Sequence, residues 1–252
     1  MAKSIKQLKS VSIDRFLYRS PNGYIEAIGV RPASKKKLPI ILFYRGGTGD
    51  FAAIENRIIN NILMPLAEAG FAVFGSQYSG GPNSEGKDEY GGKDSADMPA
   101  LLASLRKGDW NLDFNRIGAL SISRGSMMAL QNLRDGLPVQ MLASVSGAYD
   151  FFDVKKDRPD LYRFIKKERM FDPDDKNELA KRSALSFASS LPNIPYLLMH
   201  SNPDSRASYK DAKKLEKKLK KGKLMTFKGD DHALIERTDE RNAILKTWFS
   251  KL

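Results

Sequence analysis

The chain has 252 residues, of which 41% are hydrophobic and 29% are charged, a balance typical of a globular protein rather than a disordered or fibrous one. It contains no cysteine and two histidines, His200 and His232, which excludes disulfides and thiolate chemistry and argues against a histidine-rich metal site. The formal net charge is +12, but the basic residues are spread out without interleaved aromatic residues, so we expect a basic surface and no nucleic-acid partner. We expect no metal and no cofactor.

The N-terminal residues show no targeting signal. Lys3, Lys6 and Lys9 lead directly into a strand-like alternation, without the apolar stretch that a signal peptide requires. The longest apolar runs of the chain are too short to span a bilayer. We therefore expect a cytoplasmic protein with no membrane partner.

Eight segments have the composition of β-strands, and most are bounded by Gly, Pro, Asn or Asp: residues 11–18, 24–31, 39–44, 71–77, 116–122, 139–146, 194–200 and 224–227. The first two are predicted to form a hairpin, because Ser20-Pro21-Asn22-Gly23 between them is a typical turn sequence. Several later segments are continuous apolar runs. Such runs fit strands that are covered on both faces, and they indicate a parallel sheet.

Helical patterns lie between these strands, at residues 52–69, 95–107, 124–134, 208–221 and 235–250. Pro65 should kink or break the first helix, and Gly222 should stop the helix at 208–221. The strand and helix alternation predicts a three-layer α/β sandwich. Residues from about 150 to 190 interrupt the alternation with charged helical sequence. We expect them to be a small cap within one domain that spans residues 1–252.

One strand, turn and helix pattern carries a candidate nucleophile. The turn is residues 121–125, with the sequence Ser-Ile-Ser-Arg-Gly, and Ser123 is its central residue. Such a turn lifts a serine hydroxyl clear of the sheet, while small neighbouring residues relieve the crowding. Ser121 occupies a position where this kind of turn usually has glycine, and serine is still small enough to be accommodated. The pattern therefore predicts Ser123 as a nucleophile.

A serine hydroxyl needs a base near neutral pH, and the base needs a carboxylate to orient it. His232 and Asp204 both follow predicted strands, at the end of the sheet where parallel strands gather functional groups. His200 is a rival for the base. Asp230 and Asp231 are rivals for the carboxylate, although they would have to fold back onto the adjacent imidazole.

Acyl transfer also needs hydrogen-bond donors for the developing oxyanion, each worth about 3 kcal/mol. One donor would be the backbone N–H of Arg124, after the nucleophile. The second would come from the glycine-rich loop at residues 44–49, since glycine lets the backbone approach a ligand closely. No Gly-Lys-Ser/Thr sequence follows that loop, which argues against a phosphate-binding loop. Tyr149 and Phe151 follow the sixth strand and are candidates either for the substrate pocket or for packing between cap and core.

Taken together, an ordered series of landmarks resembles the catalytic domain of the prolyl oligopeptidase family of α/β-hydrolases. The landmarks are the loop at 45–47, residues 70–73 leading to 78–81, residues 92–97, the serine turn, residues 182–185, residues 200–204, residues 231–232 and residues 248–249. The resemblance implies an α/β-hydrolase fold with an eight-stranded, mostly parallel sheet and an antiparallel N-terminal hairpin. It also implies a triad of Ser123, Asp204 and His232, and an oxyanion site at the Arg124 N–H and the loop of Arg45 and Gly46.

This sequence departs from the family pattern at three positions. Ser121 and Ser201 stand where the family usually or commonly has glycine, and Arg45 stands where it often has His or Tyr. None of these departures removes a catalytic group. About 37 residues precede the catalytic core, so we expect no counterpart of the propeller that larger members carry.

The function that follows is a serine hydrolase that works through an acyl-enzyme. Its substrates are expected to be small esters or short peptides, as for a prolyl oligopeptidase-like peptidase or esterase. The alternative is a catalytically degenerate binding protein on a hydrolase fold. The sequence gives no indication of the oligomeric state.

Overall fold

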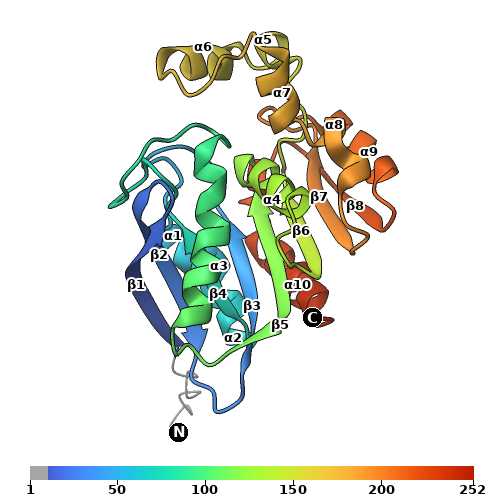
Figure 1. Ribbon diagram of the computed structural model, residues 1–252. Coiled ribbons are helices and arrows are strands. Elements are labelled where there is room, and N and C mark those ends of the chain that lie inside the picture. The colour runs from blue at the N-terminus through green and yellow to red at the C-terminus, as the bar shows by residue number, and fades with distance from the viewer. Residues whose placement is uncertain (1–10) are drawn as a thin grey trace, which may run out of the picture.

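A computed structural model describes residues 11–252. Its centre is an eight-stranded sheet with the strand order β1-β2-β4-β3-β5-β6-β7-β8 (Figure 1). The strands are β1 (Val11–Ser20), β2 (Gly23–Pro32), β3 (Leu38–Tyr44), β4 (Ala72–Ser76), β5 (Leu112–Ile122), β6 (Met141–Val145), β7 (Tyr196–Asn202) and β8 (Gly222–Lys228). Strands β1 and β2 pair antiparallel, as do β2 and β4, and every other pair is parallel. The mostly parallel sheet with an antiparallel N-terminal hairpin is confirmed.

Helices cover both faces of the sheet, as the three-layer prediction requires (Figure 1). Helices α3, α4 and α9 contribute to the core on one face, and α2 and α10 contribute to the core on the other. The helical elements are α1 (Asn56–Ile58), η1 (Ile59–Leu63), α2 (Met64–Glu68), η2 (Lys93–Ala96), α3 (Asp97–Lys107), α4 (Arg124–Arg134), α5 (Val154–Asp157), α6 (Pro159–Lys167), α7 (Lys176–Arg182), α8 (Ala184–Phe187), η3 (Ala188–Ser190), α9 (Tyr209–Lys218), η4 (His232–Leu234) and α10 (Thr238–Phe249).

Strand β3 is an unbroken apolar run because both of its faces are buried. Ile40 and Leu42 belong to the core under α3, α4 and α9, while Ile41 and Phe43 belong to the core under α2 and α10. Successive side chains of a strand point to opposite faces. Both sets must therefore be apolar when helices cover both sides of the sheet.

The predicted hairpin is present, with Ser20 opposite Gly23 in the register of β1 and β2. Gly23 has φ +128°, a conformation that residues with a Cβ rarely adopt. Within residues 11–252, no helix combines the length and the apolar content that crossing a membrane would take.

The helix expected at 52–69 begins later and is not broken at Pro65. It starts at Asn56 and passes through one wider π-helical turn, Ile59–Leu63, before α2. Proline has no N–H, so a helix loses the hydrogen bond to the carbonyl four residues earlier. That carbonyl is Asn61 O, and it instead accepts hydrogen bonds from Arg241 (2.8 Å) and Asn242 (2.9 Å) of α10. The proline thus helps to join α10 to this helix.

Gly222 does not end a helix, because α9 stops at Lys218 and Gly222 is the first residue of β8.

The charged segment expected at about 150–190 contains α5, α6, α7, α8 and η3, and α5 and α6 lie beyond one end of the sheet (Figure 1). Arg182 of α7 is buried and donates hydrogen bonds to the backbone oxygens of Glu89 (3.0 Å) and Tyr90 (2.8 Å). These bonds attach the segment to the loop that precedes η2.

Candidate active site

Ser123 lies at the sharp turn between β5 and α4, as the sequence predicts. Its backbone has φ 55° and ψ −124°, a combination that is costly for a residue with a side chain. Two glycines, Gly125 in the turn and Gly46 in the loop after β3, allow the turn and that loop to pack closely. A Cβ on Gly125 would lie 2.2 Å from the Tyr44 backbone oxygen, and one on Gly46 would lie 3.1 Å from the Ser123 Cβ. The loop after β3 therefore packs directly against the serine.

The structure brings His232 and Asp204 to this serine from two other strand ends. His232 Nε2 lies 3.0 Å from Ser123 Oγ. On the other side of the ring, Nδ1 lies 3.0 Å from each carboxylate oxygen of Asp204. The Asp204 side chain is fully buried and the His232 side chain is 15% exposed. The arrangement can pass a proton from a hydroxyl to an imidazole that a buried carboxylate holds in place.

Asp204 is kept ionised in spite of its burial. Burial raises the pKa of the Asp204 carboxyl, but the hydrogen bond and charge of His232 and the backbone N–H groups of Arg206 and Ala207 outweigh it and lower the pKa to about 2. Those N–H groups lie 2.9 Å and 3.0 Å from Oδ1. A fixed negative charge therefore faces the imidazole throughout the physiological pH range.

The rival residues have other partners. His200 is buried, with Nε2 3.1 Å from the Ala207 oxygen and 3.4 Å from Asp204 Oδ2, so it packs behind the carboxylate. Asp230 accepts the Ser205 N–H. Asp231 accepts the N–H groups of Ile235 and Glu236 and so organises the turn after His232.

Arg45 takes part in the site in a way that the sequence does not reveal. Its buried guanidinium donates to the Gln77 oxygen at 2.6 Å and 3.1 Å. It also donates to three carbonyls of its own loop, those of Gly46, Gly49 and Phe51, at 2.9–3.2 Å. The loop therefore curls around the side chain of its first residue. Burial lowers the pKa of Arg45 to about 10, against the opposing charge interaction with Tyr78, so the group remains charged at neutral pH.

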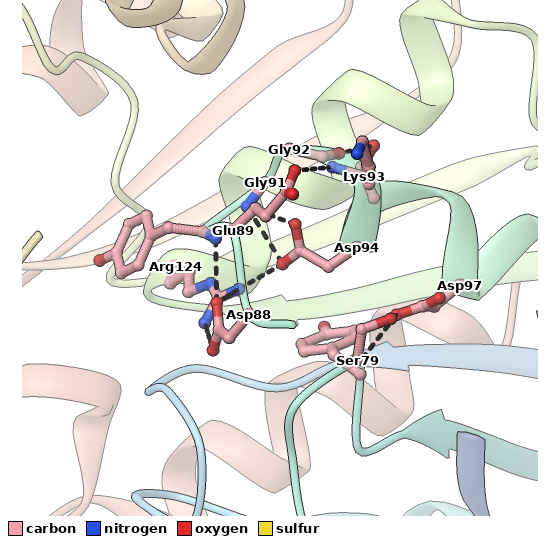
Figure 2. Close-up of polar contacts among 12 residues, drawn as sticks. Ser79, Asp88, Glu89, Gly91, Gly92, Lys93, Asp94, Asp97 and Arg124 are labelled. Carbon is pink, nitrogen blue, oxygen red and sulfur yellow. Dashed lines mark hydrogen bonds and ion pairs between the residues drawn. The ribbon is translucent and has the colours of Figure 1, made fainter. Parts of the chain in front are cut away.

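A buried ion cluster under the nucleophile was also missed by sequence reasoning (Figure 2). The Arg124 guanidinium donates to both oxygens of Asp88 (2.7 Å each), to Asp94 Oδ2 (2.5 Å) and to the Gly47 oxygen (2.9 Å). Burial lowers the pKa of Arg124, but the two carboxylates outweigh it and the net shift is upward. The cluster fastens the start of α4 to the loop after β3. Asp94 was noted only within a family landmark, and nothing in the sequence marked Asp88.

Asp97, from the same landmark, has a structural role. It accepts hydrogen bonds from the Ser79 N–H (2.7 Å) and hydroxyl (2.8 Å), which Figure 2 shows, and from Ser20 Oγ (2.5 Å) and Asn22 Nδ2 (3.1 Å). One buried carboxylate thus joins the N-terminal hairpin turn to the loop after β4.

Ser123 and His232 open into a cavity of about 520 Å³, which Arg45, Gly46 and Arg124 also line. Leu161 and Phe164 of α6 supply wall residues from the 150–190 segment. Tyr149 and Phe151 are not among the described residues that line this cavity, so we correct their expected place. Tyr149 is buried with its hydroxyl 2.6 Å from Ser144 Oγ, and Phe151 is buried against Tyr90.

Comparison with known proteins assigns the chain to a family. The sequence profile of the prolyl oligopeptidase family matches residues 59–251, which is more than half of the chain. The chain belongs to the prolyl oligopeptidase family. The protein is therefore a serine hydrolase.

Individual relatives of this family member agree with that assignment. The uncharacterized peptidase YtmA of Bacillus subtilis is 27% identical over 206 residues, which cover 81% of this chain and 77% of that protein. An acylaminoacyl peptidase of Pyrococcus horikoshii has a TM-score of 0.79 at 20% identity over 97% of this chain. The chain spans 42% of the length of that enzyme. The Pyrococcus furiosus esterase PF2001 has a TM-score of 0.76 at 14% identity, with coverage of 100% of this chain and 95% of that one. The two structures support the fold.

The residues that depart from the family pattern all have partners in this structure. Ser121 is buried and its hydroxyl lies 3.4 Å from the Ala143 oxygen of β6. Ser201 is buried and donates to the Asp231 oxygen at 2.9 Å, which fixes the loop that carries His232. Each polar group is thus directed into the protein rather than toward the nucleophile.

Proposed function

We propose that this prolyl oligopeptidase family member hydrolyses esters or short peptides through a Ser123, His232 and Asp204 triad. The observation that supports this most directly is the pair of contacts on the two ring nitrogens of His232. One nitrogen lies 3.0 Å from the hydroxyl of Ser123, whose backbone is strained, and the other lies 3.0 Å from the buried carboxylate of Asp204. That is the arrangement needed to activate a hydroxyl at neutral pH.

In the first half of the reaction, His232 Nε2 takes the Ser123 proton as Oγ attacks the substrate carbonyl carbon. The negative oxygen that forms is bound by the Arg124 backbone N–H and by the loop at Arg45 and Gly46. The bond to the leaving group then breaks, and the imidazolium gives its proton to the departing alcohol or amine. Asp204, ionised because its pKa is about 2, stabilises the imidazolium.

In the second half, a water molecule gives its proton to His232 and attacks the acyl-enzyme carbonyl. The bond to Ser123 Oγ breaks, the serine recovers its proton, and the carboxylic acid leaves. Every step uses side chains and backbone groups of this chain, and none requires a cofactor.

The described residues form one domain in this proposal, with the segment at about 150–190 as a cap over the site. Two observations support the cap. Leu161 and Phe164 of α6 line the cavity that holds Ser123, and α5 and α6 lie beyond the end of the sheet (Figure 1). A cavity of about 520 Å³ suits a small ester or a short peptide.

The proposal is tested with a fluorophosphonate probe and with 4-nitrophenyl butyrate. Wild type is expected to be labelled and to release nitrophenol. Ser123→Ala should lose the label and at least about 10⁴-fold in kcat, whereas exposed Ser186→Ala should behave as wild type. Equal labelling of wild type and Ser123→Ala would remove Ser123 from its role. Absence of labelling and turnover in folded wild type would instead indicate a degenerate binding protein.

A further inference from the structure

The cavity next to Ser123 is lined by charged side chains of mostly one sign. Among the described residues that line it, six are arginines and one, Asp160, is acidic. The remainder of the wall includes the apolar residues Ile58, Leu161 and Phe164. A concave surface with one sign of charge and apolar walls concentrates ligands of the opposite charge.

Three of the six arginines are used within the protein. Arg45 donates to loop carbonyls, Arg124 pairs with two aspartates, and buried Arg241 donates to the Ala233 and Asn61 oxygens. Their hydrogen-bonding capacity is largely spent on the fold, although Arg45 and Arg241 still add positive charge to the cavity.

The other three, Arg57, Arg158 and Arg206, form what we call the arginine rim. Arg57 and Arg206 are exposed, and within residues 11–252 neither forms a salt bridge with a carboxylate. Arg158 is half-buried and pairs with Asp160 at 2.8 Å. The rim therefore keeps two guanidiniums whose charge is not neutralised by a protein partner.

Arg206 is held in place from both sides of the site. Its backbone N–H donates to Asp204 Oδ1 at 2.9 Å, and its carbonyl accepts a hydrogen bond from Arg158 at the start of α6. Its guanidinium lies over the Phe51 ring, 5.4 Å from the centroid, in the loop that follows β3. Arg206 thus connects the Asp204 loop to the loop after β3, and both Arg206 and Phe51 line the cavity.

We propose that the cavity selects substrates that carry a carboxylate, with an apolar segment between that carboxylate and the bond that is cleaved. The apolar segment packs on Leu161 and Phe164, and Arg206 and Arg57 pair with the carboxylate. A guanidinium offers a planar pair of donors that matches a carboxylate. This inference rests on the proposed hydrolase function and specifies the charge of its substrate.

The test compares two esters that differ by one methyl group, which removes the negative charge. Mono-4-nitrophenyl suberate has a free carboxylate, and its methyl ester, 4-nitrophenyl methyl suberate, is neutral. For wild type at low ionic strength, kcat/KM is expected to be about tenfold higher for the anionic ester. The preference should shrink at 0.5 M NaCl, where the Debye length is only about 4 Å. A role in folding alone would not give this salt dependence.

Substitutions of the rim arginines test whether these residues cause the preference for the anionic ester. Arg206→Gln with Arg57→Gln should bring the ratio of the two kcat/KM values close to one. Each single variant, Arg206→Gln or Arg57→Gln, should lower the ratio part of the way. Arg163→Gln is the matched control for the single variants, because it likewise removes one exposed positive charge, from α6 outside the cavity lining, and it should keep the wild-type ratio. The inference is overturned if wild type hydrolyses the neutral ester equally well, or if Arg163→Gln lowers the ratio as much as the rim variants. In both cases the triad proposal stands, because labelling of Ser123 and turnover of 4-nitrophenyl butyrate test it separately. An enzyme that hydrolyses 4-nitrophenyl butyrate but neither suberate ester would overturn this inference alone.

Discussion

Arg124 has two separate roles in our proposal, because its backbone N–H would bind the oxyanion while its side chain is buried with Asp88 and Asp94. Removing the side chain alone, as in Arg124→Met, leaves two carboxylates without their cation. Breaking a buried ion cluster in this way costs about 3–5 kcal/mol. We expect that loss in the free energy of unfolding, together with a lower kcat, since Gly47 loses its tether to the start of α4.

A triple variant separates the two effects. Arg124→Met combined with Asp88→Asn and Asp94→Asn removes the unpaired charges, so urea denaturation should show part of the stability restored. The kcat of this variant for 4-nitrophenyl butyrate should remain low. Recovery of kcat along with stability would mean that the cluster stabilises the fold without positioning the loop.

His200 gives a prediction about pH. Its pKa is lowered, chiefly by burial and against the opposing effects of the Ala207 carbonyl and Asp204. The unfolded chain, with a histidine pKa near ~6.5, therefore binds a proton more readily than the native state does. The stability that follows from a neutral His200 is complete above that pH and is lost as the pH falls below it.

Urea denaturation at pH 7.5 and pH 5.5 measures this effect. Wild type should lose stability over the interval by at most about 1.4 kcal/mol per pH unit from this group, and His200→Asn should lose less. Other titrating groups cancel in the comparison. Parallel losses in both proteins would show that the native and unfolded states bind protons at His200 alike.

Helix α4 and strand β3 are in direct contact at the first turn of the helix. Gly125 lets the first turn of the helix touch the Tyr44 carbonyl, where a Cβ would lie at 2.2 Å. Gly125→Ala should separate the two elements, cost about 1–3 kcal/mol in stability and lower kcat by displacing Ser123. Gly136→Ala is the control, since its φ of +92° imposes strain without any nearby atom. Thermal unfolding should detect both variants, and kcat only the first.

Helix α6 supplies a second test at this scale, because Phe164 forms part of the cavity wall and is 36% exposed. Phe164→Ala should raise KM for 4-nitrophenyl esters with long acyl chains and leave kcat nearly unchanged. Acetate esters should respond little. An equal effect on short and long chains would place the acyl group elsewhere.

Elements were predictable where local pattern and tertiary packing agree. The helix at 124–134 has the predicted limits because it starts directly after the sharp turn at Ser123 and is buried along its length. The expected helix at 52–69 was wrong in its start and in the effect of Pro65. The helix continues past Pro65 because the Asn61 carbonyl accepts a hydrogen bond from Arg241 of α10, 180 residues away. The side chains of Tyr149 and Phe151 turn into the core for a similar reason, namely that Ser144 and Tyr90 receive them. Sequence position alone carries no information on these long-range contacts.

At the scale of the whole molecule, the site is assembled from four separate strand ends. Arg45 follows β3, Ser123 follows β5, Asp204 follows β7 and His232 follows β8. The order of these groups could be predicted, because parallel strands present their carboxyl ends at one edge of a sheet. The ion cluster and the arginine rim could not, since their members come from short helices, helix ends and loops that are far apart in the sequence.

Such a composite site should fail before the sheet does. In rising urea, hydrolysis of 4-nitrophenyl butyrate should be lost at a lower concentration than tryptophan fluorescence changes. Trp110 packs against Phe16 and Phe74, and Trp248 belongs to α10. Loops that join distant segments open more easily than packed strands and helices. Coincident curves would mean that the site and the sheet unfold as one unit.

The loop between β4 and η2 is held by two guanidiniums, since Arg124 donates to Asp88 and Arg182 of α7 donates to the Glu89 and Tyr90 oxygens. A bulky molecule that lifted α7 would pull on Glu89 and Tyr90, and through them on Asp88. Asp88 is bound to Arg124, so the displacement would be passed to the residue next to Ser123. The position of α7 is in this way coupled to the residue that follows the candidate nucleophile.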